Sequence, residues 1–80
     1  MPVVFRHRGV RFFFFSNEGS PREPIHIHAL NGDREAKFWL SPDVSVAQSF
    51  GFSRRELTEL TRVVTERRHE IERAWHEHFG

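Results

Sequence analysis

The first forty residues alternate between apolar and polar side chains, which is typical of β-strands that cover one face of a core. Two strands are predicted at residues 3–7 and 10–16, because β-branched and aromatic residues dominate both segments and Arg8-Gly9 suits a tight turn between them. A two-residue loop sets the expected cross-strand pairs. These are Phe5 with Phe12 and Val3 with Phe14 on one face, and Arg6 with Arg11 and Val4 with Phe13 on the other.

A second hairpin is predicted over residues 24–40. Asn31-Gly32 is a strong signal for a two-residue turn, since both turn positions require or tolerate positive φ. Side chains two apart in a strand share a face, so His26 and His28 lie together. The turn predicts four pairs on their face: Leu30 with Asp33, His28 with Glu35, His26 with Lys37, and Pro24 with Trp39.

The second half of the chain has helical signals. Residues 17–24 form a connector by composition, and Ser41 followed by Pro42 predicts the start of a short helix over residues 42–49, stopped by Gly51. Ser53 and Glu56 have the spacing of a capping box. A long helix is therefore predicted over residues 54–79. Its apolar stripe includes Leu57, Leu60, Val64 and Ile71.

These elements predict one domain, spanning residues 1–80, of the α+β class. The expected architecture is an antiparallel four-stranded sheet followed by a short helix and a long C-terminal helix packed on one sheet face. The stripe of the long helix is expected to cover a sheet face formed by Phe12, Phe14, Ile25, Ile27 and Phe38.

Composition narrows the function classes. The chain has no cysteine, which excludes disulfides and thiolate metal sites, and a net charge of +1, which does not by itself predict nucleic-acid binding. Nine phenylalanines and two tryptophans supply most of the packing material. No segment has the length of a membrane span and no signal peptide is evident, so a cytoplasmic protein with no membrane contact is expected.

Several motifs in order resemble a small bacterial family, the domain of unknown function 4160. The resemblance rests on residues 11–19, on Pro24-Ile25-His26-Ile27-His28, on residues 35–40, on Gly51-Phe52-Ser53 and on residues 74–80. Members of that family are discussed as candidate halves of toxin–antitoxin-like pairs. The resemblance implies a cognate small protein partner and, less directly, an RNA target. A second copy of the chain is the other expected partner, because a domain this small gains buried surface by self-association.

The predicted sheet face that carries the two histidines suits RNA. Aromatic rings stack on bases, cations hold phosphates, and an imidazole moves protons near neutral pH. The residues assigned to RNA binding are Arg6, Arg11, Phe13, Phe15 and Trp39. In a metal-independent endoribonuclease, His28 backed by Glu35 would be the general base and His26 the general acid. Lys37 with Arg11 would then stabilise the charge developing on phosphorus.

Three alternatives remain open at this point. In the first, the histidines are ordinary solvent-facing strand residues. In the second, the domain is a non-enzymatic interaction or dimerisation module with Phe13, Phe15 and Trp39 as anchors. In the third, His26, His28 and Glu35 bind a metal ion. Only two ligands are secured by spacing, so no metal and no cofactor is assigned.

Overall fold

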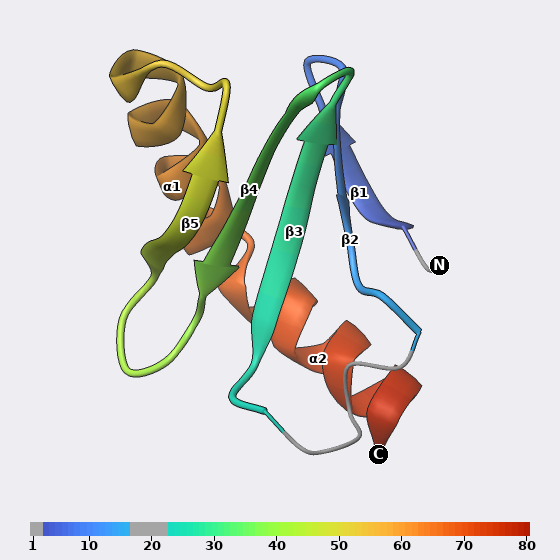
Figure 1. The fold of residues 1–80 in the computed structure, drawn as a ribbon. Coiled ribbons are helices and arrows are strands. Elements are labelled where there is room, and N and C mark those ends of the chain that lie inside the picture. Colours follow the sequence, from blue (N-terminus) through green and yellow to red (C-terminus); the bar gives the residue numbers. More distant parts are fainter. Residues whose placement is uncertain (1–2, 17–22) are drawn as a thin grey trace.

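The computed structural model describes residues 3–16 and 23–80. Its five strands form one antiparallel sheet in which each strand pairs with the next in sequence, and two helices follow (Figure 1). The elements are β1 (Val3–His7), β2 (Val10–Phe13), β3 (His26–Asn31), β4 (Arg34–Trp39), β5 (Ser45–Phe50), α1 (Arg54–Glu66) and α2 (Arg68–Phe79). Both helices lie behind the sheet in Figure 1 and leave its front face uncovered by helix. The α+β class is confirmed, while residues 17–22 of the predicted connector lie outside the described residues.

The predicted short helix over residues 42–49 is wrong, and the sheet has five strands instead of four. Residues 45–50 form β5, which pairs antiparallel with β4 through Trp39 opposite Ser45 and Glu35 opposite Phe50. Ser41-Pro42 imitates a helix start, but the chain turns there and a β-branched and aromatic segment follows. All six residues of β5 are exposed, because the strand forms an edge of the sheet.

The first hairpin turns at Arg8-Gly9, as expected. Both residues have positive φ, 49° and 82°, as a two-residue type I′ turn requires. Phe5 lies opposite Phe12 and Arg6 opposite Arg11, as predicted. The pairs predicted farther from the turn are wrong, because an irregularity between Val3 and Phe5 shifts the register and places Val3 opposite Phe13.

The second hairpin turns one residue later than predicted. Its central residues are Gly32 and Asp33, with Gly32 at a φ of 64°, and Asn31 pairs with Arg34. The predicted pairs are therefore wrong: His28 lies opposite Lys37, and His26 opposite Trp39. Each partner moves by two positions, so every side chain keeps its predicted face.

The helical segment begins at the predicted residue but forms two helices instead of one. The Ser53 hydroxyl accepts a hydrogen bond from the Glu56 amide at 3.1 Å, and the Glu56 carboxylate accepts one from the Ser53 amide at 2.8 Å, which confirms the capping box. The single long helix is wrong, because α1 ends at Glu66 and α2 begins at Arg68. The Arg67 guanidinium at this break lies 4.3 Å from the centre of the Phe5 ring. The break lets α2 cross behind the lower end of the sheet (Figure 1).

The core lies between the sheet and the helices. Phe12, Ile27 and Phe38 are fully buried on the helix-facing side of the sheet, in the positions that alternation predicts. The helices contribute Leu60, Val63, Val64, Ile71 and Trp75 to the core. Within the described ranges, no helix is long and apolar enough to cross a membrane.

Candidate functional site

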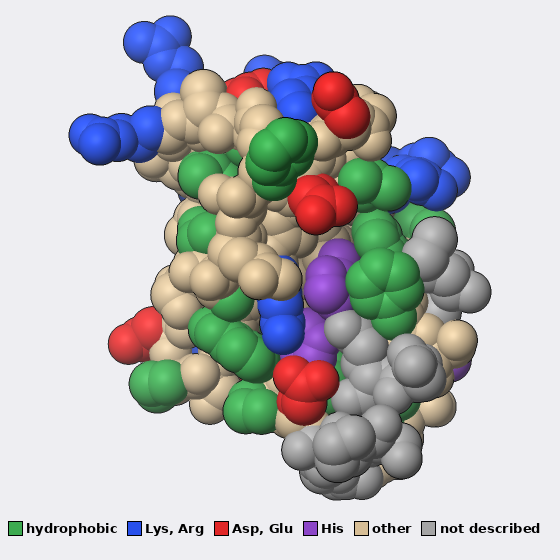
Figure 2. All heavy atoms as spheres, viewed as in Figure 1, with side chains coloured by type: hydrophobic (Ala, Val, Ile, Leu, Met, Phe, Trp, Pro, Cys, Tyr) green, Lys and Arg blue, Asp and Glu red, His purple; other side chains and the backbone are tan. Residues whose placement is uncertain are grey.

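The sheet face opposite the helices, called the open face below, carries most of the predicted site residues. The strand registers place on this face Arg6, Arg11, Phe13, His26, His28, Leu30, Glu35, Lys37, Trp39, Gln48 and Phe50, of which His26 is fully buried. Figure 2 shows this face, with histidine (purple) and Lys or Arg (blue) side chains near its centre and hydrophobic side chains (green) around them. The sequence therefore predicted the membership of this face for β2, β3 and β4. On β1 the prediction is correct for Arg6 and wrong for Val4, because the register shift places Val3 opposite Phe13. The contribution of β5 was not predicted.

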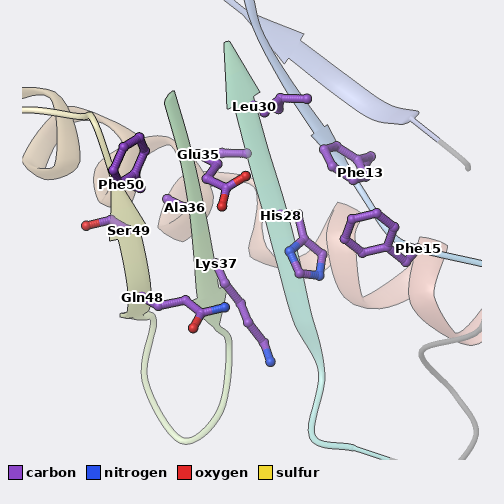
Figure 3. A pocket seen from close by; sticks show the side chains of 11 residues that line it. Phe13, Phe15, His28, Leu30, Glu35, Ala36, Lys37, Gln48, Ser49 and Phe50 are labelled. Carbon is purple, nitrogen blue, oxygen red and sulfur yellow. The ribbon is translucent and has the colours of Figure 1, made fainter. Parts of the chain in front are cut away.

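A cavity of about 410 Å³ occupies the middle of the open face. Side chains from β2, β3, β4 and β5, together with Phe15 after β2, surround it (Figure 3). We call it the aromatic groove; its lining residues are Phe13, Phe15, His28, Ala29, Leu30, Glu35, Ala36, Lys37, Gln48, Ser49 and Phe50.

Three rings form one wall of the aromatic groove. Phe13 stacks on His28 with ring centres 5.6 Å apart, and the Phe15 ring meets His28 edge-on at 4.6 Å. Phe13 is 4% exposed, whereas Phe15 is 43% exposed. Phe13 is therefore packed within this wall and orients His28, while part of the Phe15 ring faces solvent.

The opposite wall comes from β5 and was missed by the sequence analysis. Phe50 is the most exposed large hydrophobic residue described, at 67%, and it lies across the sheet from Glu35. Gln48 lies opposite Lys37 on the same face. The available signal was the strand propensity of Val46 and Phe50, with which the helix-start motif at Ser41-Pro42 competes.

Lys37 and Glu35 bring opposite charges to the open face. The Lys37 ammonium lies 4.4 Å from the centre of the Trp39 ring and 3.6 Å from a carboxylate oxygen of Glu23. Glu35 is exposed and lies opposite Leu30, not opposite His28 as predicted. The two side chains point in different directions in Figure 3, with the ammonium directed toward the lower end of the sheet.

His26 does not reach the aromatic groove. Its side chain is fully buried, its Nδ1–H donates to the Pro24 carbonyl at 2.9 Å, and its ring lies 5.1 Å from that of Trp75 on α2. The expectation that both imidazoles face solvent is therefore wrong for His26. Its position at the start of β3, where α2 crosses behind the sheet, explains the burial.

Arg6 and Arg11 lie on the open face beside the groove but do not line it. They are opposite each other on β1 and β2, and Arg11 is also opposite Leu30, which does line the groove. Arg6 is exposed and Arg11 half-buried. They extend positive charge from the groove toward the β1 edge.

Ionic contacts at the other end of the sheet attach it to α1. His7 Nε2–H donates to Glu59 at 3.1 Å, and Arg34 donates to Glu56 at 2.6 Å. Hydrogen bonds from Arg62 and then from His7 lower the pKa of the Glu59 carboxyl. The backbone hydrogen bond from Ser53 is the largest influence that lowers the pKa of Glu56, and the Arg34 charge adds to it. These carboxylates stabilise the fold and lie outside the groove.

The metal alternative has no complete ligand set in the described chain. Over residues 3–16 and 23–80, no group of three or more histidine, cysteine, aspartate or glutamate side chains is arranged to hold a metal ion.

Comparison with known proteins gives one match. The family model described as a domain of unknown function (DUF4160) matches residues 9–76, which includes every strand of the groove and most of both helices. No curated protein and no solved structure matches the chain.

Proposed function

Because the chain belongs to the DUF4160 family, whose description assigns no activity, we propose a function from the aromatic groove itself: it binds unpaired RNA. The observation that carries the proposal is a cavity of about 410 Å³ with exposed rings on both walls and a lysine between them. Unpaired bases stack on aromatic side chains, each such contact contributing about 1–3 kcal/mol. Phe15 and Phe50 supply the exposed rings.

The charges on the open face favour a modest affinity. Lys37, Arg11 and Arg6 are the cations closest along the strands to the groove, and the whole chain has a net charge of only +1. Neutralising about three phosphates of a single strand gives a slope near −2 in a plot of log K against log salt concentration. Binding should therefore weaken with salt, but less steeply than for a strongly basic domain.

RNA cleavage is the narrower form of the proposal. Of the four residues assigned to catalysis, His28, Glu35 and Lys37 line the groove. His26 is fully buried and does not line it, although its ring packs against that of His28 with ring centres 5.3 Å apart. A single imidazole supplies either the general acid or the general base, so cleavage would rely on His28 with Lys37 stabilising the phosphate charge. Incubating the protein with a labelled RNA tests this form: products that disappear in His28→Ala support cleavage, and intact RNA limits the function to binding.

Fluorescence anisotropy with a short single-stranded oligouridine tests binding directly. Phe50→Ser should weaken binding about tenfold, because one stacking surface is lost. Val46→Ser is the matched control, since Val46 is an exposed apolar residue of the same strand that does not line the groove. Absence of binding by the native chain, or equal losses in the two variants, would contradict the proposal.

A partner protein or a second copy of the chain is a second proposal, favoured by the β5 edge. Six consecutive exposed and uncharged residues form this strand, and its outer hydrogen-bonding groups offer a template for another strand. Pairing there would place the chain in a toxin–antitoxin-like complex or a dimer while leaving the groove open. Gln48→Lys, which places a charge on the edge, should lower the mass of the assembly seen by light scattering; an unchanged mass would exclude this edge.

A further inference from the structure

The carboxylate of Glu35 is placed where it can read a base. Its residue lies opposite Leu30 on β3 and opposite Phe50 on β5, so two neighbouring strands hold it in the middle of the sheet. Figure 3 shows the carboxylate extending over the groove, between the Phe50 ring on one side and the His28 ring on the other. Among the described residues that line the groove, Glu35 is the one acidic side chain.

Lys37, on the same strand as Glu35, contacts Trp39 and Glu23 and does not form a salt bridge with Glu35. The Lys37 ammonium lies over the Trp39 ring and beside Glu23, at 4.4 Å and 3.6 Å respectively. Among the residues that the structure describes, no salt bridge or hydrogen bond joins a cation to the Glu35 carboxylate. Carboxylate oxygens act as hydrogen-bond acceptors, so this side chain suits a ligand that presents donors.

A carboxylate discriminates strongly among the four bases. Guanine presents two adjacent donors on its pairing edge, N1–H and the N2 amine, which match the two oxygens of a carboxylate. Adenine and cytosine each place a ring acceptor beside their amine, and uracil places carbonyl acceptors on both sides of its single N–H. We infer that the aromatic groove selects guanine, with Glu35 holding the N1–H and N2 amine in a bidentate contact.

The neighbouring side chains fit the same base. Gln48, opposite Lys37, carries an amide N–H that suits the O6 carbonyl of guanine. The exposed rings of Phe15 and Phe50 border the groove and can contact a purine face. A carboxylate repels phosphate, and contact with a base gives it a favourable role inside a groove for RNA.

This inference rests on the proposed RNA binding, and its test separates the two. The probes are short oligouridines with one central base varied among guanine, adenine, cytosine, uracil and hypoxanthine, and the readout is anisotropy with the native chain. The guanine probe should bind about tenfold more tightly than the adenine, cytosine and uracil probes. The hypoxanthine probe should fall between them, because it keeps N1–H and lacks the N2 amine.

Two variants with the same change of charge complete the test. Glu35→Gln should remove the guanine preference, whereas Asp33→Asn, at the exposed turn outside the groove, should keep it. Equal affinity of the native chain for all probes overturns guanine selection and leaves RNA binding standing. A preference that survives in Glu35→Gln overturns the role of Glu35. If no probe binds, the inference and the proposed function both fail.

Discussion

The structure predicts different consequences for replacing the two histidines of β3. His26 is fully buried beside Trp39 and Trp75, and His28 is half-buried in the aromatic groove. We therefore expect His26→Ala to reduce stability and His28→Ala to reduce RNA binding.

The magnitude for His26→Ala follows from what the side chain touches. Truncating a buried aromatic side chain costs about 3–5 kcal/mol, and an imidazole, being smaller than a phenyl ring, belongs near the lower end. The Pro24 carbonyl also loses its donor at 2.9 Å. A total of about 3 kcal/mol is a large fraction of the roughly 4–12 kcal/mol expected for a domain of this size, and lowers Tm by roughly 12–24 °C.

Urea denaturation followed by tryptophan fluorescence measures this loss, and anisotropy measures RNA binding under conditions where each variant is folded. His28→Ala should change the free energy of unfolding by about 1 kcal/mol or less and weaken binding about tenfold. The reasoning is refuted if His26→Ala has the same urea midpoint of unfolding as the native chain. It is also refuted if His26→Ala abolishes RNA binding while its Tm is unchanged.

Three further predictions concern the scaffold. Ser53→Ala should lower the free energy of unfolding by about 1 kcal/mol, because the capping box is lost; an unchanged urea midpoint would contradict this. Gly51→Ala should destabilise more than Gly32→Ala in thermal melts. Both glycines have positive φ, but only at Gly51 would the new Cβ approach the Arg34 Cα, at 3.2 Å, so equal losses would be inconsistent with this contact. The pKa of Glu59 is lowered from 4.5 by its hydrogen bonds, so Glu59 stabilises the fold above that pH and the contribution is lost as pH falls through the lower folded-state value. The Tm of the native chain should therefore fall more steeply below about pH 4.5 than that of Glu59→Gln, and parallel curves would count against it.

Local sequence signals predicted the parts of the fold that depend on near neighbours. Alternation in β3 and β4 assigned the faces correctly, and the Ser53 capping box located the start of α1. A turn displaced by one residue at Gly32 changed the pairs without changing the faces, since strand periodicity is two.

The errors arose where distant contacts decide the outcome. Ser41-Pro42 carries a helix-start signal, but pairing with β4 makes the following segment a strand. Because that segment was predicted to be a helix, its contribution to the wall of the groove was not predicted. The burial of His26 could not be predicted, because it depends on contact with Trp75, a residue far along the sequence. Trp75 lies on α2, which begins only after the helix breaks at Arg67. The alternation of side chains within β3 predicts the face on which His26 lies, but not its contact with Trp75.

The central claim is that unpaired RNA binds on the open face within the aromatic groove. Titrating an isotope-labelled chain with the guanine-containing oligouridine and following its amide NMR signals tests this claim most directly. The predicted result is that the largest shifts fall on β2, β3, β4 and β5, at Phe13, His28, Lys37 and Phe50, with α1 unaffected. Signals that do not move, or shifts confined to the helices, would contradict the account.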